Sequence, residues 1–385
     1  MSPHRYDAAV IGGGLAGRAA AVALAAAGLE TLHAAPPAPP DRRTSALMGP
    51  SVAFLRRIGV LDDPGSIGHP LRQIRIIDAT HRLIRAPETL FDSAEAGLDA
   101  FGWNFANTAL ADAFETVAAA RPELTTLPLA VTGVRLDGDA ELTLADGSTV
   151  ATRLVVGADG KKSMVRQSAG ITAREHAFSQ AALVCDLDLA RPLGETSVEF
   201  HYDQGPLTLV PATGRRANLV WIDDRARLEA ARADPAALPR LLAEKSQRLF
   251  GAVDLASPCF VFPLSRLTVD QAGARGAVLV GEAGHAFPPI GAQGLNLGLR
   301  DVADLLDVVA LADRGAADWA AVLSRDYARW RAADLLRTNA TVDALFRSLL
   351  ADMVPAQAVR AGGLWALKLL PALRKRAFAA GMGAP

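Results

Sequence analysis

The N-terminal segment RYDAAVIGGGLAGRAAAVALAAAG, residues 5–28, carries the clearest structural signal in the chain. A short β-rich run ends at a GxGxxG pattern formed by Gly12, Gly14 and Gly17, and an alanine-rich run and Gly28 follow. The pattern predicts a strand, a tight turn, a helix and its C-cap. A pyrophosphate needs free backbone N–H groups at a helix N-terminus with no side chain in the way. Gly12 suits the turn, Gly14 the close approach of the pyrophosphate, and Gly17 the packing of helix on strand. The stretch therefore predicts a dinucleotide site.

One feature of that fingerprint is missing. The usual motif has an acidic residue at the end of the second strand, which binds the adenosine ribose hydroxyls. Here that place falls at Ala34 or Ala35, and Glu30 lies at the start of the strand and would point elsewhere. We expect the ribose to be held more loosely or by another group.

Two later segments also combine a buried strand with a glycine turn and a carboxylate. They are LVVGADGKKSMVR at residues 154–166 and VLVGEAGH at 278–285, and the second leads through PPIGAQGLNLGLRD, residues 288–301, into a helix. A glycine-rich helix start offers free N–H groups and a positive dipole, which suit the anionic N1–C2=O edge of a reduced flavin. An NAD dehydrogenase has no need for this second site.

As an ordered set, these motifs resemble those of the class A flavoprotein aromatic hydroxylases, and most closely the ubiquinone-biosynthesis hydroxylases. The set comprises GxGxxG, RTSAL at residues 43–47, the 157–166 motif and the 281–298 motif, and the resemblance runs from about residue 5 to the C-terminus. It implies the fold of p-hydroxybenzoate hydroxylase with one FAD. That fold is α/β, with a Rossmann-like FAD-binding domain, an inserted antiparallel-sheet substrate domain and C-terminal helices.

The resemblance also implies roles for individual residues. Glu282 takes the place of the usual Asp on the ribityl chain, Arg43 and Asn107 hold the ribityl and pyrophosphate region, and Asp159 links flavin binding to reduction by nicotinamide. The alternative for Arg43 is a solvated surface arginine. The expected cofactor-binding residues are Gly12, Gly14, Gly17, Arg43, Asn107, Val131 (through the main chain at the adenine), Asp159, Glu282, Gly294, Leu295 and Asn296.

The cofactor is expected to carry the chemistry, since the seven histidines have no metal-ligand spacing and there is no GxSxG elbow. By the resemblance, NAD(P)H reduces FAD, O2 adds at C4a to give a hydroperoxide, and the terminal oxygen is transferred to an electron-rich phenol ring. By the same resemblance, the backbone of Pro289 is expected to lie where the flavin hydroperoxide forms. His285 could serve as an acid or base, but its place beside a glycine turn favours a structural hydrogen bond.

The predicted domains are discontinuous. Residues 1–71, 101–177 and 268–335 are expected to form the FAD-binding domain, and residues 72–100 and 178–267 the substrate-binding sheet. Residues 336–385 are expected to form a helical tail. The proline run at 36–40 is predicted to be a stiff surface connection.

Charge and composition indicate which partners and which compartment to expect. A net charge of −1 over 385 residues gives no field to hold nucleic acid, and no apolar run reaches the ~20 residues of a spanning helix. The two cysteines, Cys185 and Cys259, lie far apart in the sequence, fit a reducing compartment and are interpreted as small core residues. Because the N-terminus enters a strand within a few residues, no signal peptide is predicted and we expect a cytoplasmic protein.

The C-terminal segment suggests a membrane partner. Residues 360–385 carry five Lys or Arg side chains and no acid, beside leucines, Trp365 and Phe378. Such a segment can lie in an anionic interface, and a peripheral location on the inner face of the membrane would deliver a polyprenyl substrate. The alternative is a helix packed on the body of the protein, with Pro371 breaking it.

Three functions remain to be distinguished. The first is an NAD(P)H- and O2-dependent monooxygenase that hydroxylates a polyprenyl phenol of ubiquinone biosynthesis. The second is a flavin-dependent reductase of isoprenoid double bonds, and the third is a non-catalytic flavoprotein subunit of a biosynthetic complex. Oxygen uptake with an oxygenated product indicates the first, anaerobic turnover the second, and no turnover the third.

Overall fold

The first sheet is built around the predicted nucleotide-binding strand. In the computed structural model, which describes residues 5–80, 85–289, 291–350, 362 and 365, the sheet has eight strands and is mainly parallel. Its path is β18-β19-β11-β1-β2-β8, with β10 and β9 attached as a hairpin beyond β11. The bounds are β1 Arg5–Ile11, β2 Thr31–Ala34, β8 Leu124–Leu127, β9 Val131–Arg135, β10 Ala140–Leu144, β11 Thr149–Gly157, β18 Gly273–Ala274 and β19 Ala277–Leu279. Strands β1, β11 and β19 run parallel and end at the same edge, so their carboxyl-terminal turns meet there.

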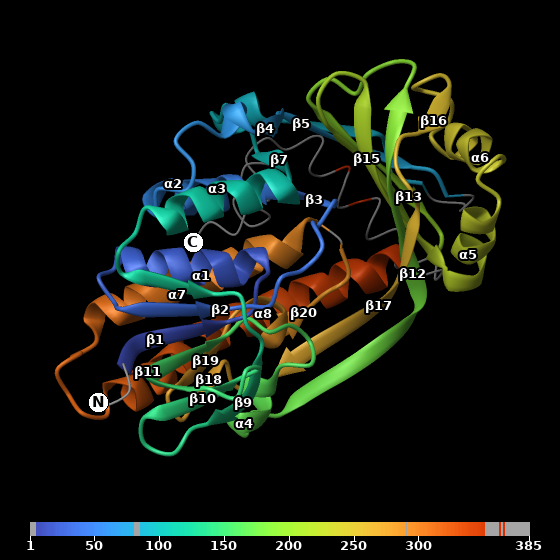
Figure 1. Ribbon diagram of the computed structural model, residues 1–385. Coiled ribbons are helices and arrows are strands. Elements are labelled where there is room, and N and C mark those ends of the chain that lie inside the picture. The colour runs from blue at the N-terminus through green and yellow to red at the C-terminus, as the bar shows by residue number, and fades with distance from the viewer. Residues whose placement is uncertain (1–4, 81–84, 290, 351–361, 363–364, 366–385) are drawn as a thin grey trace.

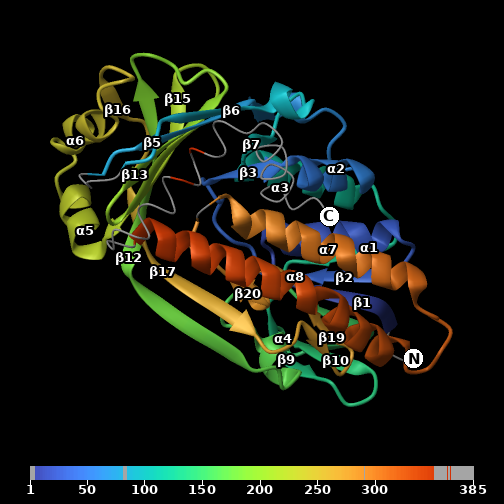
Figure 2. The same cartoon turned by 180° about the vertical axis from the view of Figure 1, so that it is seen from behind.

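Helices cover this sheet because its strands are apolar on both faces. Helix α1 (Leu15–Ala26) is buried from Ala19 to Ala25 against α3 (Asn107–Ala119) and α7 (Gln293–Leu311). Alanine lets the helices approach closely, which explains the composition of α1. Helix α8 (Trp319–Leu350) lies against α7 and the edge strands β18 and β19 (Figures 1 and 2).

The second sheet has nine strands and stands beside the first (Figure 1). Its order is β20-β17-β12-β15-β14-β13-β5-β6, with β16 paired to β12. The bounds are β5 Gln73–Asp78, β6 Thr89–Asp92, β12 Ala173–Leu189, β13 Thr196–Tyr202, β14 Gly205–Pro211, β15 Arg216–Asp224, β16 Val253–Leu255, β17 Phe260–Val269 and β20 His285–Ala286. Helices α5 (Arg225–Ala233) and α6 (Leu238–Lys245) bury one face with Leu228, Leu238 and Leu242. We call the opposite face, which is turned toward the nucleotide-binding part, the inner face.

A small third sheet lies between the two larger ones. It has the order β3-β7-β4, formed by Thr44–Met48, Gly102–Ala106 and Gly68–Leu71. The remaining elements are α2 (Gly49–Arg57), α4 (Met164–Ser168) and three 3-10 turns, η1 (Pro64–Ser66), η2 (Ser93–Ala96) and η3 (Gly281–Ala283).

Two long strands run through the predicted domain boundaries. Strand β12 begins at Ala173 and β17 ends at Val269, and the two pair along most of their lengths with an irregularity between Ala177 and Ala181. Helix α8 likewise continues across the predicted start of the tail at residue 336. The domain division therefore remains a proposal, with strands that belong to both parts. Residues 36–40 are exposed and have no regular secondary structure, as predicted.

The two cysteines, distant in sequence, are neighbours in the fold. Each adjoins the Val184–Phe260 pair of the β12–β17 ladder, and their thiols lie within hydrogen-bonding distance. Burial raises the pKa of the Cys185 thiol above its ordinary value, and Cys259 adds to the effect. Both pack into the core beneath α5 and α6, as the interpretation of core residues predicted.

Across the described part of the chain, no helix is long and apolar enough to span the hydrocarbon layer. The basic C-terminal segment lies outside the described residues except for Gly362 and Trp365. Its predicted contact with a membrane stays a prediction.

Candidate active site

The glycine turn between β1 and α1 has the backbone geometry that the sequence predicts. Gly12 has φ +125°, and an added Cβ there would lie 2.2 Å from the carbonyl oxygen of Ala158. A Cβ at Gly17 would lie 2.1 Å from the carbonyl oxygen of Gly12. At Gly14, the N-cap of α1, a Cβ would meet nothing within 4 Å of the described structure. The helix start is therefore open on the side where a pyrophosphate would bind.

Arg43 and Asn107 both donate hydrogen bonds to Asp41, a residue that the sequence analysis did not name. The Arg43 guanidinium donates from Nε and Nη2 to the two carboxylate oxygens of Asp41, each at 2.8 Å. Asn107 Nδ2 donates to Asp41 Oδ2 at 2.8 Å, and Asn107 Oδ1 accepts from the Ser45 hydroxyl at 2.7 Å. Burial opposes ionisation of Asp41, but these hydrogen bonds outweigh it and lower its pKa. Asp41 thus fixes both expected cofactor-binding residues.

Glu282 lies in η3, exposed, at the edge of the sheet where β19 ends. The turn can lie close to α1 and α7 because Gly281 and Gly298 both approach the methyl group of Ala16. The hydrogen bond to Asp41 raises the pKa of Arg43, and the charge of Glu282 raises it further. The charge of Glu282 therefore acts on Arg43, in agreement with the proposal that the two side chains belong to one site.

Asp159 has one oxygen in use and one free. Its Oδ2 accepts from the backbone N–H groups of Met164 and Val165 at 2.7 and 3.2 Å, at the start of α4. Its Oδ1 is buried and has no hydrogen-bond partner among the residues that the structure describes. A buried acceptor without a donor is costly. A ribityl or nicotinamide hydroxyl or amide is the kind of donor that would satisfy it.

The start of α7 joins the second glycine motif to the rest of the site. A Cβ at Gly294 would meet nothing within 4 Å, and the first turn of α7 contains no acid. Asn296 holds β3 against this helix, because its Oδ1 accepts from Met48 N–H at 2.9 Å and its Nδ2 donates to the Ala46 carbonyl at 2.8 Å. The Asn296 side chain is thus occupied by the protein, and its contact with a cofactor would be through the backbone.

Leu295 is half-buried in the same turn, and Pro289 is exposed just before it. Val131 is half-buried at the start of β9, close in sequence to the end of β8. The roles expected of Leu295, Pro289 and Val131 remain proposals.

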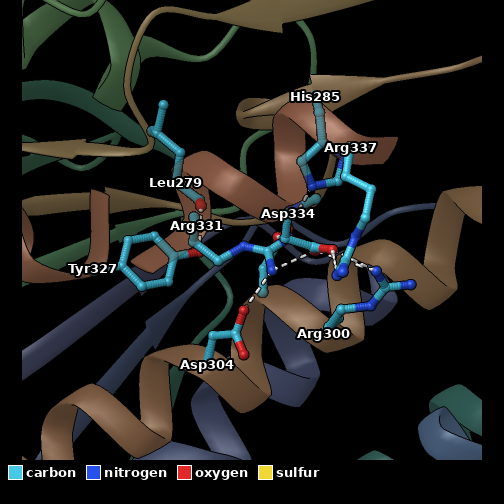
Figure 3. A network of polar contacts seen from close by, with 10 residues as sticks. Leu279, His285, Arg300, Asp304, Tyr327, Arg331, Asp334 and Arg337 are labelled. Carbon is cyan, nitrogen blue, oxygen red and sulfur yellow. Dashed lines mark hydrogen bonds and ion pairs between the residues drawn. The ribbon is translucent and has the colours of Figure 1, made fainter. Parts of the chain in front are cut away.

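A buried network of ion pairs and hydrogen bonds stabilises the turn η3 and the short strand β20 (Figure 3). His285 Nε2 lies 2.6 Å from Asp301 Oδ2, which also accepts from Gly281 N–H at 2.8 Å. Arg331 of α8 is fully buried and pairs with Asp301 at 2.6 Å and with Asp334 at 2.7 Å, and it also contacts Asp304. His285 thus has the buried hydrogen bond that a structural role requires, and that role remains a prediction. The network fixes η3 and β20 to α7 and α8.

The adenosine end of the site has no acid at the end of β2. Ala34 is buried and Ala35 is half-buried, and Ala35 limits the space beside Gly13. Arg18 reaches back from α1, donating from Nε to the Gly13 carbonyl at 3.1 Å and from Nη1 to Glu115 at 2.8 Å. Arg18 and Glu115 are the polar side chains that the structure adds to this end of the site.

The open helix starts, the free Asp159 oxygen and the convergence of Arg43 with Glu282 fit FAD. No group of three or more His, Cys, Asp or Glu side chains in the described chain could hold a metal. A nucleotide site with two glycine motifs, beside a nine-stranded and mainly antiparallel sheet, is the arrangement expected of the class of flavin-dependent aromatic monooxygenases.

Comparisons with known proteins agree. Residues 5–339 match the FAD binding domain family. The chain is 32% identical to the ubiquinone hydroxylase UbiL of Rhodospirillum rubrum, covering 98% of this chain and 89% of the relative. It is 30% identical to the 3-demethoxyubiquinol 3-hydroxylase of Escherichia coli, covering all of both chains. Its fold is similar to that of p-nitrophenol 4-monooxygenase from Pseudomonas putida, with a TM-score of 0.79, 20% identity and 98% coverage of each chain.

The chain therefore belongs to the FAD-dependent hydroxylase family that includes the ubiquinone hydroxylases. It is an FAD-dependent monooxygenase with NAD(P)H as co-substrate, and it has the fold of p-hydroxybenzoate hydroxylase, as the resemblance implied.

The sequence analysis missed two functional features. Asp41 stands two residues before RTSAL, after the proline run, and its only signal was an acid next to an expected cofactor-binding arginine. Arg331 stands in a long amphipathic helix where buried arginine is rare, so nothing in its local pattern marks it.

Proposed function

We propose that this enzyme hydroxylates the aromatic ring of a polyprenyl phenol intermediate of ubiquinone biosynthesis. The observation that carries the proposal is similarity over nearly the whole chain to two proteins, one named a ubiquinone hydroxylase and the other a 3-demethoxyubiquinol 3-hydroxylase. Because the match includes the second sheet as well as the nucleotide site, it covers the part of the fold where a substrate would bind.

Bound FAD would supply two-electron reduction by NAD(P)H and the activation of O2. The residues of this chain hold and shield it. The N–H groups at the start of α1 bind the pyrophosphate, with Gly14 leaving the space for it. Glu282 accepts hydrogen bonds from the ribityl hydroxyls, and the positive end of α7 at Gly294 and Leu295 stabilises negative charge on the ring. The main chain of Val131 contacts the adenine.

The inner face of the second sheet would cover the phenol and exclude water. Dryness matters because an activated oxygen that meets water is lost as hydrogen peroxide instead of being transferred. The backbone of Pro289 borders the reacting oxygen. Asp159 links flavin binding to reduction through its free oxygen.

The test is mass spectrometry of quinone precursors in a strain that lacks this gene. Accumulation of one precursor that lacks a ring hydroxyl would support the proposal and identify the ring carbon. Normal quinone content would contradict it. With purified enzyme, oxygen uptake with an oxygenated product separates this function from a reductase of isoprenoid double bonds, which turns over anaerobically, and from a non-catalytic subunit of a biosynthetic complex, which does not turn over.

We also propose that the basic C-terminal segment docks the enzyme on the inner face of a membrane. The support is its sequence: five cations and no acid within residues 360–385, beside apolar side chains. Each cation contributes about 1 kcal/mol near an anionic surface. Flotation with anionic vesicles should be strong for the full chain and weak for a chain that ends before Leu364. Equal flotation of the two would eliminate docking through this segment.

A further inference from the structure

A chain of polar side chains crosses from the small third sheet to the inner face of the second sheet. Asn104 of β7 donates from Nδ2 to Asn218 Oδ1 of β15 at 2.7 Å and to the Pro211 carbonyl at 3.0 Å. Asn218 Nδ2 in turn donates to Asp186 Oδ1 of β12 at 2.6 Å. Asp186 and Asn218 are directly opposed across the ladder.

The carboxylate fixes the direction of this chain. An ionised carboxylate only accepts hydrogen bonds, so Asn218 must turn its Nδ2 toward Asp186 and its Oδ1 toward Asn104. Asn104 must then turn its Nδ2 toward Asn218. If the amide of Asn104 were flipped, its oxygen would face two acceptors, Asn218 Oδ1 and the Pro211 carbonyl.

This orientation leaves the side-chain oxygen of Asn104 as an acceptor that needs a donor. Asn104 is 5% exposed, and its Oδ1 has no hydrogen-bond partner among the described residues. An unpaired buried amide oxygen costs free energy that a donor from a ligand would recover. A hydroxyl is such a donor, whereas an ether oxygen is not.

The position of Asn104 is next to the flavin site. It lies opposite Ala46 of β3, whose carbonyl accepts from Asn296 in the first turn of α7. Adjacent strands are about 4.8 Å apart. Asn104 therefore lies on β7, one strand away from the β3 backbone to which Asn296 of α7 is hydrogen-bonded. Its side chain reaches toward the second sheet.

Apolar side chains lie on one side of the polar pair on the inner face, and the Arg216–Asp188 ion pair lies on the other. Val220 and Val184 each lie two residues from Asn218 and Asp186, so they share this face and are opposed to each other. Val184 is paired with Phe260, which is 53% exposed and stacks on Phe262 at 6.3 Å between ring centroids. The inner face thus presents an apolar row next to the polar pair of Asn218 and Asp186.

We infer that Asn104 is a specificity-determining residue: its Oδ1 accepts the hydroxyl proton of the phenol substrate, while the apolar part of that substrate lies along Val220, Val184 and Phe260. The inference rests on the proposed function and adds the residue that selects a free ring hydroxyl. Asp186 acts as a positioning residue, because it orients Asn104 through Asn218.

The experiment measures binding to the FAD-loaded full chain, without turnover, by the change in flavin absorbance. The probes are a long-chain alkylphenol and its methyl ether, which differ only in the donor. We expect the wild type to bind the phenol about tenfold more tightly or better. In Asn104→Leu the ratio should fall toward one. Val220→Ala is the matched control, and it should weaken both probes and leave the ratio unchanged.

A second variant covers the case in which Asn104→Leu fails to fold. Asp186→Asn keeps the shape but frees the amides to reverse, so the ratio should also shrink. A wild-type ratio near one, or an unchanged ratio in either folded variant, overturns the inference. These outcomes are separate from the proposed function. Precursor accumulation in the deletion strain with an unchanged ratio rejects only the role of Asn104, and normal quinone content rejects the proposed function whatever the ratio.

Discussion

His285 and Asp301 form a buried 2.6 Å hydrogen bond that joins strand β20 to helix α7. Asp301 also pairs with Arg331 of α8, so one carboxylate connects three elements. The turn that carries Glu282 is held by the same carboxylate through Gly281 N–H. The geometry of the cofactor site therefore depends on charges that lie behind it.

Asp301→Asn should destabilise the fold. Burial disfavours the charge of Asp301, but His285 and Arg331 outweigh burial and lower its pKa below the ordinary value. A lowered pKa means that its stabilisation is complete above the unfolded value of about 3.9 and is lost as the pH falls through the folded value. Removing one partner of a buried pair costs about 3–5 kcal/mol.

Urea unfolding of wild type and Asp301→Asn at neutral pH measures that difference, and the gap should narrow as the pH falls below about 4. Asp326→Asn on the exposed side of α8 is the control and should change stability little. A constant gap across this range of pH would contradict the assignment.

Gly14→Val and Gly17→Val should have different effects. A side chain at Gly14 meets no protein atom within 4 Å, so Gly14→Val should fold and lose FAD because the side chain occupies the pyrophosphate position. A side chain at Gly17 overlaps the Gly12 carbonyl, so Gly17→Val should lose the fold itself. Circular dichroism and flavin content of purified protein separate the two. Normal flavin content in folded Gly14→Val would remove the site.

Glu282→Ala should lose FAD affinity without losing stability, because the side chain is exposed. Loss of a hydrogen bond to a charged group costs about 1.5–3 kcal/mol, or roughly tenfold or more in affinity. Glu282→Asp keeps the charge and should be largely tolerated. Fluorescence titration of apoprotein with FAD gives the dissociation constants, with Glu229→Ala on α5 as the surface control. Equal affinity of Glu282→Ala and wild type would refute the contact.

Asp41→Asn should weaken FAD binding modestly. Arg43 and Asn107 share Asp41 as an anchor, but the Asp41 side chain is 39% exposed, so the ion pair is worth about 0.2–1 kcal/mol and the expected loss is about two- to fivefold. When the same FAD titration is repeated at high salt, the difference in FAD affinity between variant and wild type should be smaller. Tighter binding by Asp41→Asn would show instead that Asp41 competes with the cofactor for Arg43.

The contact between Cys185 and Cys259 tests the register of β12 and β17. Two opposed residues on paired strands are close enough for a disulfide. Treatment with hydrogen peroxide, which accepts the two electrons and is reduced to water, should give an intramolecular disulfide, seen as a mass lower by two hydrogen atoms. Because burial raises the pKa of Cys185, oxidation should be faster at high pH. Cys185→Ser should form only oxidised or intermolecular products of Cys259, and a wild type that keeps both thiols would contradict the register.

The nucleotide-binding half of the molecule could be predicted from local sequence patterns. Strand, glycine turn and helix at residues 5–28 follow from local periodicity and from backbone angles that glycine alone adopts easily, as Gly12 shows with φ +125°. The turns that carry Asp159 and Glu282 could be predicted for the same reason, because the end of a strand and the turn after it are contiguous in the chain. Their assembly at one sheet edge follows from parallel pairing.

The polar contacts between segments that are distant in the sequence could not be predicted and are seen only in the folded chain. Asp41 holds Asn107 across 66 residues, Asp301 is paired with Arg331 from another helix, and Asn104 reaches Asn218 across 114 residues. No local pattern specifies such contacts, because hydrogen bonds and ion pairs between separate elements depend on how the sheets pack and not on the periodicity of either partner. The same packing brought Cys185 and Cys259 together. Local sequence thus fixed the backbone that can bind FAD, and packing fixed the charges and amides that surround it.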